Sequence, residues 1–329
     1  MDRFRFLPYH KTVMEAKSRL LHLDQFRGLA VLLMVFANAL AHYERVPSYL
    51  QHAAADGYTL PDIVMPMFLF AMGYAAQLSF RSRVNRNGVA KTILHFLIRG
   101  AILIGYGFLG TLLVENHPWD ILETLGVTGL LALPLLFLPP VARLTIASLS
   151  LIAYQVGMYL LWSKTVDRSG SPGALVEALG TFSVLFIHIS GSCLSAWLKE
   201  KPYASRVAWL ATTGAILIVL AVALNPFVPF NKHLVSVSYV LLSTGSCACG
   251  LLLFMVIAEQ LHLSIPPLEA LGRNALLLYM LSSVLILGEN VVLPGNVSLV
   301  VCVAGFGAVM FLTYLTAAIL DWKKIYVKL

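Results

Sequence analysis

Residues 23–73 read LDQFRGLAVLLMVFANALAHYERVPSYLQHAAADGYTLPDIVMPMFLFAMG, two long apolar runs on either side of a short polar loop. Each run is long enough to cross a bilayer, because about 20 apolar residues in a helix span the hydrocarbon core. The polar residues fall near the ends of the runs and in the loop, where membrane proteins place functional groups. This stretch predicts two membrane-spanning helices joined by a functional loop.

The polar residues within each run share one helix face. In the first run, Asp24, Arg27 and Asn38 fall within about 60° of one another at 100° per residue. The second run places Asp62 and Gln77 on a similarly narrow face. We therefore expect both faces to look into protein or water and not into lipid.

The composition extends this pattern to the whole chain. Of its 329 residues, 59% are hydrophobic and 12% are charged, and the mean hydropathy is +0.81. This predicts an all-α, polytopic membrane bundle of about ten helices over residues 20–329, preceded by a cytoplasmic segment over 1–19. The expected spans are roughly 23–41, 60–80, 92–114, 120–138, 144–162, 174–197, 206–224, 234–259, 267–288 and 297–319.

The 23 Lys and Arg residues are distributed unevenly between the two sides of these spans. With both termini in the cytoplasm, nearly all of them fall on the inner side, as the positive-inside rule requires of a multi-pass protein in the cell (inner) membrane. The same topology places His52 on the periplasmic or extracellular side. The net charge of +7 is thus explained by topology, and no nucleic-acid partner is expected. The outer side holds Arg45, Lys164, Arg168 and Lys232.

The cysteines do not predict a metal site or a disulfide framework. All four fall inside predicted spans, and the only closely spaced pair, Cys247 and Cys249, would point away from each other on a helix. We expect them to be small buried residues, and we expect no metal.

His52 is the central candidate for chemistry. It lies in the loop between Asn38, near the end of one helix, and Asp62, near the start of the next. Three such residues can converge without long-range contacts, and an imidazole oriented by a carboxylate can deprotonate a nucleophile. Asp62 follows Thr59 closely and also suits a helix N-cap, a role that is compatible with catalysis.

Several motifs together resemble one family. They are LDQFRG at 23–28, the Asn38 region, the His52-x9-Asp62 spacing with DIVMPMFLFAMG at 62–73, PFNKHLVSVSYVLLSTG at 229–245 and LEALGRNALLLYM at 268–280. In this combination and order they are similar to the heparan-alpha-glucosaminide N-acetyltransferase family, transmembrane acyltransferases with bacterial members. The segment WDILETLGVTGL at 119–130 departs from the family pattern, since Glu123 stands roughly where Gln or Arg is usual.

The resemblance implies an acetyl transfer across the membrane. Cytosolic acetyl-CoA would be the acyl donor, and an amino sugar such as glucosamine, or another glycan, the acceptor on the outer face. His52 matches the catalytic histidine, Asp62 its acidic partner, and Asn38 a polar residue near the acyl group.

Basic residues are the candidates for holding the donor. Coenzyme A carries phosphates, and Arg27, Arg99 and Arg273 are expected near the inner side, where guanidinium groups could bind them. Asn38 lies about 16 Å further along the helix than Arg27, so an extended donor could reach from the inner side towards His52. Asp24 suits an orienting or structural ion pair with Arg27, three residues away.

Asn231 and Lys232 in the outer PFNKH segment are candidates for binding the acceptor; otherwise they are interfacial residues. Two mechanisms stay open for His52: a general base acting on the acceptor, or a nucleophile that carries the acyl group. In the first, Asn38 or a backbone amide would support the oxyanion. The alternative function is a transporter or flippase of a polar small molecule or lipid-linked sugar, whose intramembrane charges line a path. A homodimer is possible in either case.

Overall fold

The computed structural model describes residues 9–114, 119, 121–162 and 174–326, and these residues form helices and loops without a strand. They divide into two compact units, one of residues 1–46 and 250–329 and the other of residues 47–249. Residues 1–8 of the expected cytoplasmic segment, together with Lys164 and Arg168, lie outside the described part. That the two units act as one domain over 20–329 stays a prediction.

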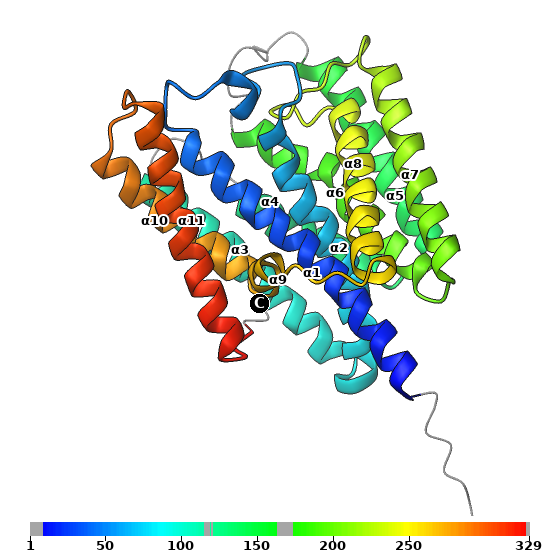
Figure 1. Cartoon of the computed structure of the whole chain (residues 1–329). Coiled ribbons are helices and arrows are strands. Elements are labelled where there is room, and N and C mark those ends of the chain that lie inside the picture. Colours follow the sequence, from blue (N-terminus) through cyan, green and yellow to red (C-terminus); the bar gives the residue numbers. More distant parts are fainter. Residues whose placement is uncertain (1–8, 115–118, 120, 163–173, 327–329) are drawn as a thin grey trace, which may run out of the picture. The chain divides into compact units, whose positions relative to one another are not determined.

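The first unit is built around the N-terminal helix (Figure 1). α9 packs along α1, and α10 and α11 contact both of these helices and each other. The helices are α1 (Tyr9–Leu40), α9 (Pro266–Arg273), α10 (Ala275–Val292) and α11 (Leu299–Trp322).

The second unit holds the remaining helices. α6 is its centre, since α2, α4, α5 and α7 all pack against it. The helices are α2 (Val64–Asn87), α3 (Val89–Val114), α4 (Ile121–Leu135), α5 (Pro140–Gly157), α6 (Ala174–Leu198), α7 (Tyr203–Leu224) and α8 (Val237–Met255), whose last turns belong to the first unit.

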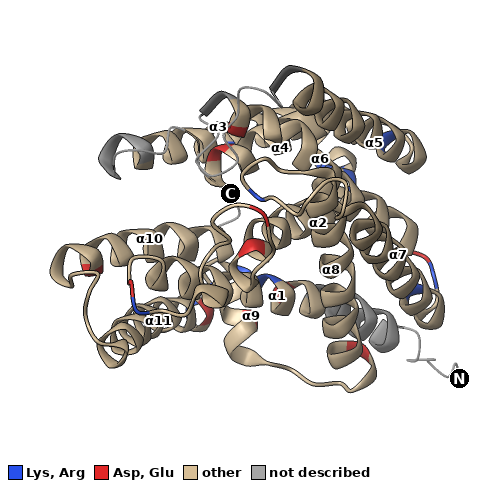
Figure 2. Cartoon of the chain, turned by 90° about the horizontal axis from the view of Figure 1, so that it is seen from above, with Lys and Arg blue, Asp and Glu red and all other residues tan. Residues whose placement is uncertain are grey.

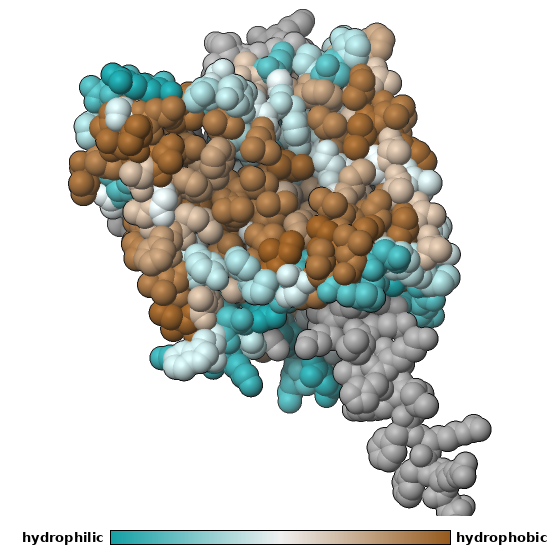
Figure 3. All heavy atoms as spheres, in the orientation of Figure 1, coloured by the Kyte–Doolittle hydropathy of each residue, from teal (hydrophilic) through white to brown (hydrophobic). Residues whose placement is uncertain are grey.

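The prediction of an all-helical membrane protein is confirmed. Nine of the described helical segments are long and apolar enough to cross a membrane. Apolar side chains dominate the face drawn in Figure 3, and charged residues are sparse along the described helices (Figure 2). Lipid is the solvent that such a surface requires.

Two of the ten predicted spans differ from expectation. The span expected over 120–138 is α4, a helix of 15 residues and about 22 Å, which is shorter than the hydrocarbon core of a bilayer. The span expected over 267–288 is interrupted at Asn274, whose φ of −122° and ψ of 32° separate α9 from α10. The Asn274 side chain donates a hydrogen bond to the carbonyl oxygen of Ile325 (3.1 Å), which ties the break between α9 and α10 to the segment after α11.

Arg143 secures the end of the short helix α4. Its guanidinium is almost fully buried and donates to the carbonyl oxygens of Leu136 (2.9 Å) and Leu138 (2.8 Å), just beyond that end. It also donates to the side-chain oxygen of Gln77 on α2 (2.5 Å). The polar face predicted for the second run therefore does look into protein, since Asp62 and Gln77 are both buried.

Glycines set the closest helix contacts, and they do so in reciprocal pairs. A Cβ atom at Gly73 of α2 would overlap the carbonyl oxygen of His188 on α6, and one at Gly191 of α6 would overlap that of Phe70 on α2. In the first unit, Gly28 and Gly272 bring α1 and α9 together in the same way. Small residues at such crossings let backbones approach and pack closely in a membrane, where helix association gains little from the hydrophobic effect.

We expect Gly73→Val to destabilise the second unit by about 1–3 kcal/mol or more, because the added side chain must push α6 away from α2. Thermal unfolding of the detergent-purified protein would measure the loss. Gly307→Val on α11 is the matched control, since open space surrounds a Cβ atom there. Equal midpoints for the two variants would contradict a close α2–α6 contact.

Candidate active site

The carboxylate of Asp62 organises the loop that precedes α2. Asp62 lies in the turn η2 (Leu60–Ile63), and its Oδ2 accepts from the backbone N–H of Thr59 (2.9 Å) and lies 3.4 Å from the N of Ala53. The Thr59 hydroxyl is within hydrogen-bond distance of both Asp62 Oδ2 (2.8 Å) and the Gln51 carbonyl oxygen (2.7 Å). Oδ1 is left for His52, whose Nδ1 lies 2.8 Å away.

This arrangement corrects the N-cap expectation for Asp62. Thr59 is the capping residue, and Asp62 is the third residue of the turn, which reaches back to the Thr59 backbone as in a capping box. The carboxylate has no solvent exposure, so these donors compensate for the loss of water around its charge.

His52 is the exposed partner of this pair. About 30% of its side chain is accessible, in contrast to the fully enclosed carboxylate of Asp62. An acidic partner at Nδ1 fixes the tautomer in which Nδ1–H donates and Nε2 carries the lone pair, an assignment made from the hydrogen bonds. Nε2 can then accept a proton from a nucleophile.

The surroundings of His52 lower the pKa of its imidazole. Burial is the largest cause, and the hydrogen bond to Asp62 opposes it. The positive charge of Lys232 and the neighbouring His233 lower the pKa further. The ring is therefore mostly neutral at pH 7, the state that a general base requires.

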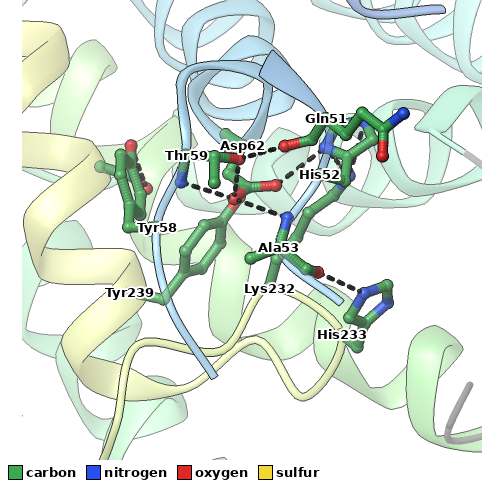
Figure 4. A network of polar contacts seen from close by, with 10 residues as sticks. Gln51, His52, Ala53, Tyr58, Thr59, Asp62, Lys232, His233 and Tyr239 are labelled. Carbon is green, nitrogen blue, oxygen red and sulfur yellow. Dashed lines mark hydrogen bonds and ion pairs between the residues drawn. The ribbon is translucent and has the colours of Figure 1, made fainter. Parts of the chain in front are cut away.

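A second loop, residues 229–236, lies against the first (Figure 4). Lys232 Nζ lies 3.0 Å from Nδ1 and 3.3 Å from Nε2 of His52. The Asn231 side chain donates to Asp56 (3.0 Å) and accepts from the backbone N–H of Leu234 (2.7 Å), so its carboxamide is used within the protein.

Further contacts join the two loops along their length. The N–H of Gly57 donates to the carbonyl oxygen of Phe230 (2.7 Å), and Nε2 of His233 lies 3.2 Å from the carbonyl oxygen of Ala53. Gly57 has a φ of 141°, which suits glycine better than any residue with a side chain. These bonds connect positions about 180 residues apart in the sequence.

Aromatic side chains from α8 and the loop support the site. The Tyr239 hydroxyl donates to the backbone carbonyl of Asp62 (2.8 Å), and the Tyr58 hydroxyl lies 3.2 Å from that of Ser243. The rings of Tyr58 and Tyr239 pack with centroids 5.7 Å apart. The sequence analysis did not single out these tyrosines: Tyr239 in an apolar helix resembles any other packing residue, and Tyr58 lies in the loop without a recognisable motif.

The predicted donor-binding arginines of the first unit are engaged with carboxylates. Arg27 lies 3.8 Å from Asp24, which agrees with the expected ion pair. Arg273 contacts Asp321 (2.5 Å), Glu269 (3.0 Å) and, more distantly, Asp24 (4.0 Å). Three acidic partners make Arg273 a poorer phosphate ligand than the sequence suggested.

Asn38 also lies in the first unit and His52 in the second. The predicted convergence of these two residues therefore stays a prediction.

Arg99 lines a narrow pocket among α2, α3, α4 and α6. His188, 1% exposed, faces the same pocket, and neither of its ring nitrogens makes a hydrogen bond of standard geometry within the described part of the chain. Nothing in the local sequence pointed to His188. The remaining wall is mostly apolar: Met72, Ala76, Phe96, Gly100, Leu103, Leu125, Gly126, Gly129 and Leu136.

Among the described residues, no group of three or more His, Cys, Asp or Glu side chains is arranged to hold a metal ion. Apolar helices around an enclosed carboxylate with an accessible imidazole thus define a multi-pass membrane protein with a candidate acid–base site.

Comparison with known proteins connects this site to a family. Residues 19–167 match the profile described as heparan-alpha-glucosaminide N-acetyltransferase, catalytic. The human protein of that name is 36% identical over 138 residues, 37% of this chain and 20% of its own length. The mouse protein is 32% identical over 131 residues, 36% and 19% of the respective lengths.

The resemblance expected from the motifs is therefore confirmed over the matched region, which contains both His52 and Asp62. The matched profile is that of a catalytic region of an N-acetyltransferase. The chain spans about a fifth of the length of the curated relatives that it matches.

We expect Asp62→Asn to lower the pKa of His52 further, because the hydrogen bond that His52 donates to the carboxylate raises this pKa. The rate of His52 modification by diethyl pyrocarbonate, followed by mass spectrometry against pH, would report this, since only the neutral ring reacts. The exposed His262 in the same samples is the reference. A midpoint that moves to higher pH would contradict the assigned contact.

Proposed function

We propose that this protein is a membrane-embedded acyltransferase that moves an acetyl group from cytosolic acetyl-CoA to an amino sugar, or another glycan, on the outer face of the cell membrane. The single observation that carries the proposal is the 2.8 Å contact between His52 Nδ1 and the enclosed Asp62 carboxylate. The similarity of residues 19–167 to an N-acetyltransferase catalytic region supports the choice of reaction.

In this mechanism His52 acts as the general base. The acceptor amine attacks the thioester carbonyl carbon, and Nε2 of His52 takes the proton that the nitrogen loses. The tetrahedral intermediate collapses with cleavage of the C–S bond, and the imidazolium returns its proton to the departing CoA thiolate. Asp62 holds the ring in place and stabilises the imidazolium, as the carboxylate of a catalytic triad does.

A covalent route uses the same residues in another order. Nε2 would attack the thioester, CoA would leave, and the acceptor would then take the acetyl group from the ring. The accessible face of His52 is compatible with both routes, and a trapped acetyl-histidine separates them.

We assign part of the donor to the pocket lined by α2 and α6, which would have to widen to admit it. Its apolar wall suits a slender acyl-pantetheine chain, and Arg99 and His188 supply polar contacts for its amides or phosphates. Met72 in this wall follows Asp62 by ten residues, or about 15 Å along the helix. A donor held here would direct its thioester towards His52, with its nucleotide nearer the cytoplasm. Arg27 and Arg273 remain candidates only if their carboxylate partners release them.

The topology belongs to the same proposal. Both termini are assigned to the cytoplasm and His52 to the outer side, following the positive-inside distribution. The lipid bilayer is the medium in which the helices pack, and a homodimer remains possible.

We expect His52→Asn to lower acyl transfer by about 10²–10⁴-fold while acetyl-CoA binding is kept, because the base is lost and the pocket is not. Release of free CoA by purified protein with acetyl-CoA and glucosamine measures the reaction. His262→Asn is the control, because His262 is exposed and its φ of 52° is tolerated by Asn.

A fully active His52→Asn variant would remove His52 from the mechanism. Wild-type protein that binds acetyl-CoA but releases no CoA with any amino sugar or glycan would favour a transporter or flippase, which does not consume a thioester. CoA release without acceptor, together with an acetylated His52 peptide, would favour the covalent route.

We expect Arg99→Ala to weaken acetyl-CoA binding by about tenfold or more, equivalent to roughly 1.4 kcal/mol, and Arg99→Lys to weaken it less. Equilibrium binding to detergent-purified protein is the measurement. Arg86→Ala, which removes an exposed guanidinium near the end of α2, is the control. Unchanged binding in Arg99→Ala would place the donor elsewhere.

A further inference from the structure

The structure places Lys232 where the sequence did not predict it. The match to the family profile does not cover this residue either. The sequence suggested that it binds the acceptor, yet its ammonium lies against the imidazole of His52, 3.0 Å and 3.3 Å from the two ring nitrogens (Figure 4). It also lies beyond residues 19–167, where the similarity to the catalytic profile ends.

The loop around Lys232 is held firmly in this position. Asn231 on one side is 2% exposed and is bonded to Asp56 and to the N–H of Leu234. His233 on the other side reaches the backbone of Ala53. An ordinary surface lysine has no such fixed neighbours. The contacts on both sides of Lys232 therefore hold its ammonium close to His52.

The charges around His52 come from both loops. Asp62 faces Nδ1 from η2, Lys232 faces both nitrogens from the 229–236 loop, and His233 lies nearby, whereas Asp56 is engaged by Asn231. A cation in this place disfavours the imidazolium and favours any negative charge that develops next to Nε2.

We propose that Lys232 is a catalytic residue of the acyl-transfer step, whose ammonium stabilises the oxyanion of the tetrahedral intermediate and does not bind the acceptor. This inference rests on the proposed function.

The geometry of the reaction explains the placement. An acceptor nitrogen that donates to Nε2 lies about 3 Å from it, and the carbonyl carbon bonds to that nitrogen. As this bond forms, the C=O electron pair moves to oxygen, the acceptor proton moves to Nε2, and Lys232 keeps its own proton. When the C–S bond breaks, the oxyanion becomes a carbonyl again and the imidazolium protonates the CoA thiolate. An ammonium 3.3 Å from Nε2 is within reach of that oxygen.

The test compares Lys232→Met, which removes the charge, with Lys232→Arg, which keeps a cation, and with Lys199→Met, an exposed control between α6 and α7. Steady-state CoA release with acetyl-CoA and glucosamine gives kcat and the KM for glucosamine. We expect Lys232→Met to lose about 10²–10³-fold in kcat with little change in KM, Lys232→Arg to recover part of the loss, and Lys199→Met to behave as wild type.

A second readout does not need acyl transfer. The pH midpoint of His52 modification by diethyl pyrocarbonate should move to higher pH in Lys232→Met, because a positive charge beside the ring is removed. For the same reason, the acidic limb of kcat/KM should move to higher pH. Lys232→Gln, which retains a hydrogen-bonding side chain, replaces the Met variant if the latter does not fold.

Three results would overturn the proposal. A raised KM for glucosamine with unchanged kcat would make Lys232 an acceptor ligand, as the sequence suggested. An unchanged His52 midpoint would show that the ammonium does not lie against the ring. Wild-type protein that releases no CoA with any acceptor would overturn the proposed function and the oxyanion role together, and the midpoints would then test the Lys232–His52 contact by itself.

Discussion

An enclosed carboxylate is the constraint from which the site follows. The Asp62 side chain has no contact with solvent, and an ionised group in such surroundings is retained only when donors replace the lost water. Those donors come from Thr59, Ala53 and His52, so the loop must fold back over the start of the helix. The orientation of the imidazole thus follows from the hydrogen bonds that satisfy a buried charge, and Nε2 is the nitrogen that the carboxylate does not use.

The helices hold this arrangement through contacts between backbones. Gly73 and Gly191 let α2 and α6 approach until each helix touches the carbonyl groups of the other, at Phe70 and Gly73 of α2, which follow Asp62 by eight and eleven residues. Because the contact involves backbone and not flexible side chains, α2 has little freedom to slide or rotate against α6. The start of α2, which directly follows the η2 turn with Asp62, is fixed accordingly, and so is the wall of the Arg99 pocket on the same helix.

The sequence could predict those parts of the protein that depend on local pattern. Apolar length predicted the long helices, and the proximity of His52 to Asp62 in the chain predicted their pairing. Periodicity does not reveal where a helix stops within an apolar run, so the short α4 and the break at Asn274 were missed. Contacts across 180 residues leave no local signal either, and for this reason Lys232 was assigned to the acceptor and not to His52.

The separation between the two loops of the site also has a consequence for how the protein is made. Lys232 is synthesised 180 residues after His52, a delay of about 10–40 s at ordinary translation rates. During that interval the chain contains His52 and Asp62 but not the 229–236 loop that packs against them. Tyr239, which donates to the backbone of Asp62, has not been synthesised either. A nascent chain that already contains the imidazole and its acidic partner therefore still lacks part of the site, which is complete only after the later helices have been synthesised.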